Sequence, residues 1–213
     1  MSIEPPQPEP SPTATASAEA KEPKRERGKL RVAALMNAGG ELFSEKGYEA
    51  TTMTEIAQRA GASIGSLYQF FPSKEALAEA LFLRYAARAG EKFDEMLKSA
   101  PMLNATQLAD LIVDMRLEML SHRDAAIALS ESISAIVERR QPMRDLTCAR
   151  IAAILRAMNP ALPNARAIVS AAAILQVMKG VQTLAAMERE TGHPFVAEAR
   201  TMLSVYIARA LQT

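Results

Sequence analysis

The sequence predicts an all-α fold of about nine helices. Apolar residues recur at helical spacing from Lys29 to the end of the chain, without runs in which Val, Ile and Thr alternate with polar residues. Glycines and prolines fall between these periodic stretches. A chain of 213 residues that is 49% hydrophobic is long enough to bury a sizeable core in one or two domains.

Residues 1–26 are predicted to form a disordered, proline-rich tail with a basic end. Large apolar residues are scarce here, so the segment cannot bury enough surface to offset the entropy of ordering. Six basic residues lie between Lys21 and Arg31, at the end of this tail and just after it. Two interpretations of them are open: a solvated start of a helix, or an arm that contacts phosphates or the minor groove.

Composition excludes several classes of protein. The 25 Lys and Arg are balanced by 24 Asp and Glu, so any nucleic-acid site must be a local patch. The single cysteine, Cys148, excludes an intramolecular disulfide and a multi-cysteine zinc site. The uncharged apolar stretch from Ala167 to Met178 is too short to span a bilayer, and the N-terminus lacks the apolar core of a signal peptide. We therefore expect a cytoplasmic protein without a membrane partner.

Residues 27–73 are predicted to form a helix-turn-helix DNA-binding domain, and they contain clear signals for the starts and ends of its helices. The first predicted helix ends at Lys46-Gly47, where a cation precedes the residue that most readily terminates a helix. Thr52 and Glu55 have the spacing of a capping box, which predicts the start of a short second helix. The turn Gly61-Ala62-Ser63 leads into a third helix. A short helix, a glycine-containing turn and another short helix form the helix-turn-helix pattern.

The third helix is more polar on one side than a core helix would be. Small residues there allow close approach to a groove, a tyrosine hydroxyl suits a phosphate, and a glutamine amide can both donate and accept at an adenine edge. The alternative is the solvated face of an ordinary helical hairpin. The residues that point outward, or flank the apolar face, are Ile64, Gly65, Ser66, Tyr68 and Gln69.

Many residues between 30 and 77 stand at the spacing of a known domain. They are Ala38, Glu41 to Thr52, Ile56-Ala57, Ala60-Gly61-Ala62-Ser63, Gly65, Leu67-Tyr68, Phe70-Phe71, Ser73-Lys74-Glu75 and Leu77. This segment closely resembles the DNA-binding domain of the TetR (tetracycline-repressor-like) family. One departure is Gly39-Gly40, where the family usually carries Ala and a larger residue.

The resemblance implies a role for each matching position. Thr52 is expected to contact a phosphate, and Tyr68 and Lys74 are expected to hold the DNA backbone on the far side. The positions at which the family reads bases are Ile64, Gly65, Ser66 and Gln69, and those that correspond to its core are Ile56, Ala57, Leu67 and Phe70. The resemblance also implies a homodimer on a near-palindromic double-stranded DNA operator and a small-molecule effector. It places the protein in the bacterial cytoplasm, associated with the nucleoid when bound to DNA.

Residues 74–213 are predicted to be a ligand-binding and dimerisation domain. A long helix begins after Ser73, and later helices are expected over 108–119, 126–140 and 142–158, the last opened by Pro142. The stretch from Ala165 to Met187 is apolar around nearly its whole circumference, so it must bury a second side against something besides its own core. Two such last helices from each of two subunits would form a four-helix interface. The alternative is a central helix of a monomeric bundle.

An effector pocket is expected in this second domain. Nine of the twelve methionines lie between residues 96 and 202, and methionine-rich interiors adapt to varied apolar or amphipathic guests, although methionine is also ordinary core filler. Glu131 is a further polar candidate. The candidate ligand-binding residues are Met115, Arg116, Met119, His122 and Gln176.

Catalysis is not expected. The chain has two histidines, His122 and His193, and it lacks HExxH, GxSxG and glycine-rich phosphate-loop motifs. We expect no cofactor and no metal site. We interpret Cys148 as buried packing, with a redox sensor as the alternative. The sequence therefore predicts a ligand-responsive, homodimeric DNA-binding regulator, with repression as the favoured mode. The alternative is a helical protein-interaction module with a vestigial DNA-binding head, and a small-molecule-processing enzyme is disfavoured.

Overall fold

The computed structural model describes residues 26–132 and 134–212, without the side chains of 121–132, 134–137, 139 and 140. The described part contains eight α-helices, one 3-10 turn (η1) and no strand, which confirms the all-α prediction. Residues 1–25 of the predicted tail lie outside the described residues, so the disorder expected there stays a prediction. The elements are α1 Glu26–Ala50, α2 Met53–Arg59, α3 Ile64–Phe70, α4 Lys74–Ser99, η1 Ala100–Met102, α5 Ala105–Ser132, α6 Ser134–Met158, α7 Asn164–Thr191 and α8 Phe195–Leu211.

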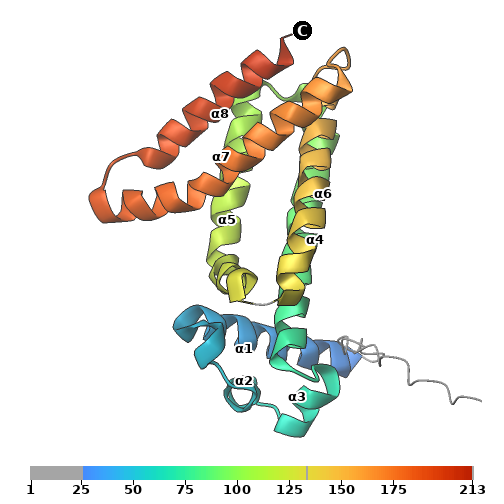
Figure 1. The fold of residues 1–213 in the computed structure, drawn as a ribbon, viewed down its shortest axis with the longest axis vertical. Helices are drawn as coiled ribbons and strands as arrows, with labels where there is room; N and C mark the ends of the chain where they lie inside the picture. Colours follow the sequence, from blue (N-terminus) through green and yellow to red (C-terminus); the bar gives the residue numbers. More distant parts are fainter. Residues whose placement is uncertain (1–25, 133, 213) are drawn as a thin grey trace, which may run out of the picture.

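The helices enclose two cores, and α4 contributes to both (Figure 1). Helices α1 to α3 form the head, drawn in blue and cyan at one end of the molecule, and α5 to α8 form the body. The first half of α4 supplies Leu77 and Leu81 to the core of the head, and its second half supplies Phe93 and Met96 to the core of the body. Met143 of α6 also packs against the core of the head. A movement within the body can therefore reach the head through α4 and α6.

The predicted boundary signals of the head are confirmed. Gly47 adopts a left-handed φ of 83°, which interrupts α1 at the expected residue. Thr52 and Glu55 form a complete capping box at α2. Ser63 and Ser73 accept backbone N–H groups at the starts of α3 and α4, at 3.2 and 3.1 Å. Each of these helices therefore begins where a local side chain replaces missing backbone hydrogen bonds.

The body differs from the prediction in its number of helices. Three helices were expected between residues 108 and 158, but the residues described there, 108–132 and 134–158, belong to only two, α5 and α6. Pro142 lies inside α6 and does not open a helix. Proline removes one hydrogen bond within a helix, and because Pro142 is exposed, water can satisfy the carbonyl that its missing N–H leaves free.

The two glycines of α1 have different surroundings. A Cβ atom added to Gly39 would lie 2.9 Å from Cδ2 of the buried Leu77, so Gly39 allows α1 and α4 to approach closely. A Cβ atom added to Gly40 would lie at an ordinary 3.8 Å from Leu81. The departure from the family pattern at Gly39 therefore has a packing reason in this chain.

Helix α7 buries one face and exposes another apolar face. Ala171 and Ile174 are fully buried in the body, whereas Val169 is 68% exposed. The complete helix is long and apolar enough to cross a membrane by length and composition alone, a criterion that the core helix of a helical domain also meets. Its contacts with α6 and α8 instead place it in the body of a helical domain. The absence of a membrane partner stays a prediction.

Candidate nucleic-acid interface

Helix α3 is anchored by Leu67 and exposes its opposite side. Leu67 is completely buried in the core of the head, whereas Ile64 is 41% and Tyr68 is 50% exposed. Ile64 and Tyr68 are four residues apart, so they lie on the same face of the helix. Gly65 and Gln69 form a second exposed pair at the same spacing.

The remaining predicted positions of α3 follow the same division. Ser66 is half-buried, and a Cβ atom added to Gly65 would meet no atom within 4 Å. The surface beside Gly65 is therefore open to close approach by a ligand. Phe70, expected in the core, is only half-buried, and Phe71 takes the fully enclosed position. The structure brings all the predicted base-reading residues together on α3.

Thr52 lies exposed at the start of α2 with its polar groups already engaged. Its hydroxyl donates to Glu55 Oε2 at 2.7 Å and accepts from Glu55 N at 3.3 Å, and its own N–H donates to the same carboxylate at 2.9 Å. Hydrogen bonds from Lys46 and Thr52 lower the pKa of Glu55 to about 2, so this carboxylate is ionised at neutral pH. A phosphate contacting Thr52 would share these donors with Glu55.

Lys74 joins the start of α4 to the end of α1. Its ammonium donates to the backbone carbonyls of Tyr48, Glu49 and Thr51 at 2.9, 3.3 and 3.1 Å. The same Nζ lies 4.3 Å from the centre of the Tyr48 ring, a cation–π contact. An ammonium has three donors, so these carbonyls can occupy all of them. The phosphate contact expected of Lys74 stays a prediction, and the structure adds a positioning role that the sequence did not indicate.

Ion pairs position α2 against α1. Arg59 donates to both carboxylate oxygens of Glu45, at 2.8 and 2.9 Å, and lies 3.5 Å from Glu41. A hydrogen bond from Arg59 lowers the pKa of Glu45, and Lys46 forms a further pair with Glu55. Sequence reasoning missed these pairs because Arg59 and Glu45 are fourteen residues apart, a separation that only the crossing of two helices makes close.

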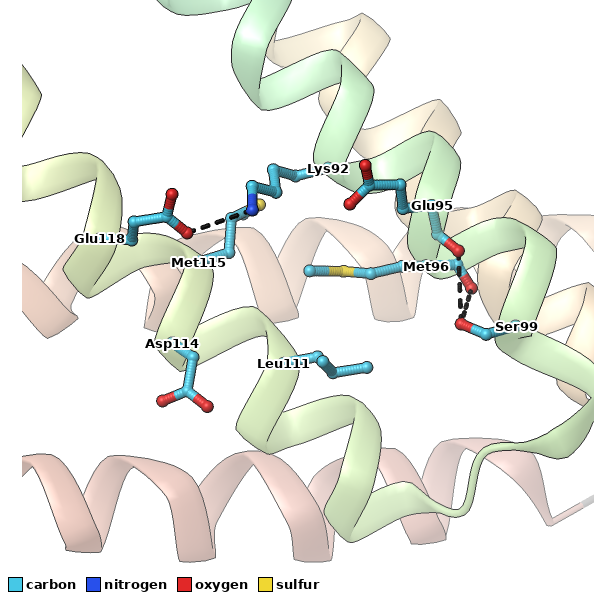
Figure 2. Close-up of a pocket in the computed structure, with 8 residues that line it drawn as sticks. All are labelled: Lys92, Glu95, Met96, Ser99, Leu111, Asp114, Met115 and Glu118. Carbon is cyan, nitrogen blue, oxygen red and sulfur yellow. Dashed lines mark hydrogen bonds and ion pairs between the residues drawn. The ribbon is translucent and has the colours of Figure 1, made fainter.

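A pocket of about 210 Å³ lies between α4 and α5 (Figure 2). Its methionine side chains are Met96 and Met115, and Lys92 pairs with Glu118 across it at 3.2 Å. Of the predicted effector-binding residues, only Met115 lines this pocket. The complete lining is Lys92, Glu95, Met96, Ser99, Leu111, Asp114, Met115 and Glu118.

The structure separates the other predicted effector residues. Arg116 and Met119 are buried in the body next to Met115, whereas Gln176 is exposed on α7. His122 belongs to α5, but its side chain lies outside the described part of the chain, as does that of Glu131. Among the described residues, no three His, Cys, Asp or Glu side chains gather as metal ligands would.

Cys148 is half-buried beside the core of the body, and burial raises the pKa of its thiol. The raised pKa disfavours the reactive thiolate at neutral pH. This environment supports the interpretation of Cys148 as a packing residue, although the side chain is less enclosed than expected.

Comparison with known proteins supports the prediction for the head. Residues 35–81 match the family described as "Bacterial regulatory proteins, tetR family". The HTH-type transcriptional regulator UidR of Escherichia coli K12 is 30% identical over 95 residues, which are 45% of this chain and 47% of UidR. The HTH-type transcriptional repressor KstR of Rhodococcus jostii is 37% identical over 86 residues, 40% of this chain and 38% of KstR.

A solved structure extends the likeness to the body. FadR of Bacillus subtilis, in complex with stearoyl-CoA, is 16% identical with a TM-score of 0.60, covering 83% of this chain and 97% of FadR. At this identity the likeness concerns the fold alone. The chain matches less than half the length of the curated relatives named above. These comparisons confirm the resemblance to the TetR family and the fold class.

Proposed function

We propose that this chain, which carries the TetR-family DNA-binding domain, is a homodimeric transcriptional repressor that a small effector releases from its operator. It acts in the bacterial cytoplasm on double-stranded DNA. The observation that carries the proposal is the exposed side of α3. Ile64, Tyr68 and Gln69 are exposed on this helix, and Leu67 anchors its opposite side in the core of the head. The repressor name of KstR supports the direction of regulation.

The surface of α3 fits a major groove in size and chemistry. The helix begins at the exposed turn after Gly61, so its first residues can enter a groove while α2 lies across the backbone. Gly65 leaves room beside the base edges, and the Gln69 amide can donate and accept together. In this arrangement Tyr68 and Thr52 bind phosphates and fix the register of the protein on DNA.

DNA binding is tested by fluorescence anisotropy at near-physiological salt. The labelled DNA comes from upstream of the protein's own reading frame, with scrambled DNA as the comparison. We expect a preference of about 10³ or more for the upstream DNA. Gln69→Ala should reduce this preference, Tyr68→Phe should weaken binding to both DNAs alike, and Gln141→Ala, on the exposed part of α6, should change neither. Weak binding that is equal on both DNAs would favour the protein-interaction alternative.

A second copy of the chain is proposed to cover α7 and α8. These two helices pack against each other, and each leaves an apolar strip uncovered. Val169 is 68% exposed on α7, and Val205 is 65% and Met202 51% exposed on α8. A neighbouring apolar surface of this kind is typical of a protein interface, and a two-fold axis lets the same patch serve both subunits.

The dimer is tested by sedimentation or light scattering of three variants. Val169→Glu and Val205→Glu should each shift the protein toward monomers, because they would bury a carboxylate in the interface. Met102→Glu is the control, since Met102 is also highly exposed but belongs to η1 and not to α7 or α8. If both valine variants remained dimeric, the interface would not lie on α7 and α8.

Release by an effector is proposed to act through α4. This helix contributes to both cores, with Leu77 in the core of the head and Phe93 in the core of the body. An effector that binds one arrangement of the body more tightly than another would tilt α4 and change the spacing of the two α3 helices. The complex of FadR with stearoyl-CoA supports the binding of a ligand by a protein of this fold.

A further inference from the structure

Arg116 is buried in the body without an anionic partner. Among the described residues it is the only charged side chain that is more than nine-tenths buried. Its Nη1 donates to the Tyr85 hydroxyl at a long 3.4 Å, and its Nε is buried without a hydrogen-bond partner. Burying a cation in this way is costly unless an anion accompanies it.

The neighbouring carboxylate on α5 forms no ion pair with the guanidinium of Arg116. Glu118, two residues further along α5, pairs with Lys92 at 3.2 Å and with Arg88 at 3.5 Å. No ion pair joins Arg116 to a carboxylate in the described part of the chain. Burial lowers the pKa of Arg116, and only the interaction with the Tyr85 hydroxyl opposes this shift. Arg116 therefore has no carboxylate to compensate its charge among the described residues.

We propose that Arg116 anchors a small carboxylate effector with an apolar body. With Nη1 directed to Tyr85, the Nε and Nη2 edge remains, and this edge matches the two oxygens of a carboxylate. The proposal rests on the ligand-responsive function proposed above and names the chemical class of its effector.

The residues that share a face with Arg116 define the rest of the ligand. Ile112, Val113 and Met119 lie three or four residues away on α5, and all three are buried and apolar. Met115, beside Arg116 in the sequence, lines the open pocket between α4 and α5 (Figure 2). Methionine side chains adapt readily to a guest, so an aliphatic or aromatic body fits here better than a sugar or a nucleotide.

The test uses octanoate as the probe and octan-1-ol as its uncharged match. Binding is measured by calorimetry and by thermal shift on the full-length protein without DNA. Arg116→Met keeps the length of the side chain and removes the charge. Arg88→Met is the matched control, because it removes a cation from the same region at a half-exposed site.

We expect saturable octanoate binding that weakens by about tenfold or more in Arg116→Met, in line with the loss of a charge-assisted bidentate contact. Arg88→Met should bind octanoate like the unmodified protein, and octan-1-ol should not distinguish the variants. The ligand-free Arg116→Met protein should also melt at a higher temperature, because the unpaired buried charge is gone.

Two results would overturn the proposal. One is equal octanoate affinity in Arg116→Met and the unmodified protein, and the other is no saturable binding up to about 10 mM, the limit of weak specific affinity. Operator anisotropy with octanoate separates this inference from the proposed function. Octanoate that binds through Arg116 without releasing operator DNA would leave the anchor in place and contradict effector control.

Discussion

Helices α2, α3 and α4 each begin at a hydroxyl side chain that accepts a backbone N–H, whereas α7 and α8 begin after prolines that make no side-chain cap. At α8 the cap comes from another helix, since Glu188 of α7 accepts the N–H of Val196 at 2.8 Å. The starts of these three helices are thus set by residues close in sequence, whereas the start of α8 depends on a side chain from another helix. A short capping motif therefore predicts where α2, α3 and α4 begin, but no such motif marks the start of α7 or α8.

The largest expected effect is the loss of stability when a buried leucine is removed from either core. Leu67→Ala in the head and Leu203→Ala in the body each remove a fully buried leucine, so each should cost about 2–5 kcal/mol of unfolding free energy. Circular dichroism and size-exclusion chromatography follow the outcome. Leu67→Ala should abolish DNA binding and keep the oligomeric state, and Leu203→Ala should weaken the oligomer. If the two variants behaved identically, head and body would unfold as one unit.

Lys74→Met should have the next largest effect, because it leaves three backbone carbonyls without their shared donor. We expect a loss of about 1.5–3 kcal/mol, the range for hydrogen bonds to a charged group. Urea unfolding of Lys74→Met, beside the exposed Lys98→Met on the same helix, measures it. Unchanged stability with weaker DNA binding would assign Lys74 to phosphate contact alone.

The glycines of α1 should respond differently to alanine. Gly40→Ala should stabilise the protein by about 0.5–1 kcal/mol, because alanine loses less backbone entropy in a helix and its Cβ finds an ordinary contact. Gly39→Ala should gain nothing, since its Cβ would press on Leu77. Thermal melts of the two variants compare them directly. A gain at Gly39 equal to that at Gly40 would contradict close packing of α1 on α4.

The smallest expected effect is the pH dependence of the capping box. The folded pKa of Glu55 is lowered to about 2 from 4.5, so its stabilisation is complete above pH 4.5 and is lost as the pH falls toward 2. Glu55→Gln should remove this part of the acid sensitivity of the head. Because the pair with Lys46 is exposed to solvent, added salt should reduce the difference. Acid titrations of both proteins by circular dichroism would show it.

The head and its candidate DNA-reading face could be predicted from sequence because their signals are local. Thr52 with Glu55, Ser63 before α3 and Gly47 at the break of α1 act within a few residues, and helical spacing assigns Leu67 inward and Tyr68 outward. The effector site could not be predicted in this way. Gln176 falls on an exposed face while Arg116 is buried, and nothing in their local sequence distinguishes them.

The sequence by itself determined the helical fold, the helix-turn-helix and the residues that face outward from α3, because periodicity and capping depend on neighbours along the chain. Only the tertiary structure decided that Pro142 lies inside a helix, that Lys74 joins α4 to α1 and that Arg59 reaches Glu45. It also left Arg116 buried without an anion. These features depend on how helices cross, and the crossing is set by the packing of residues far apart in the chain.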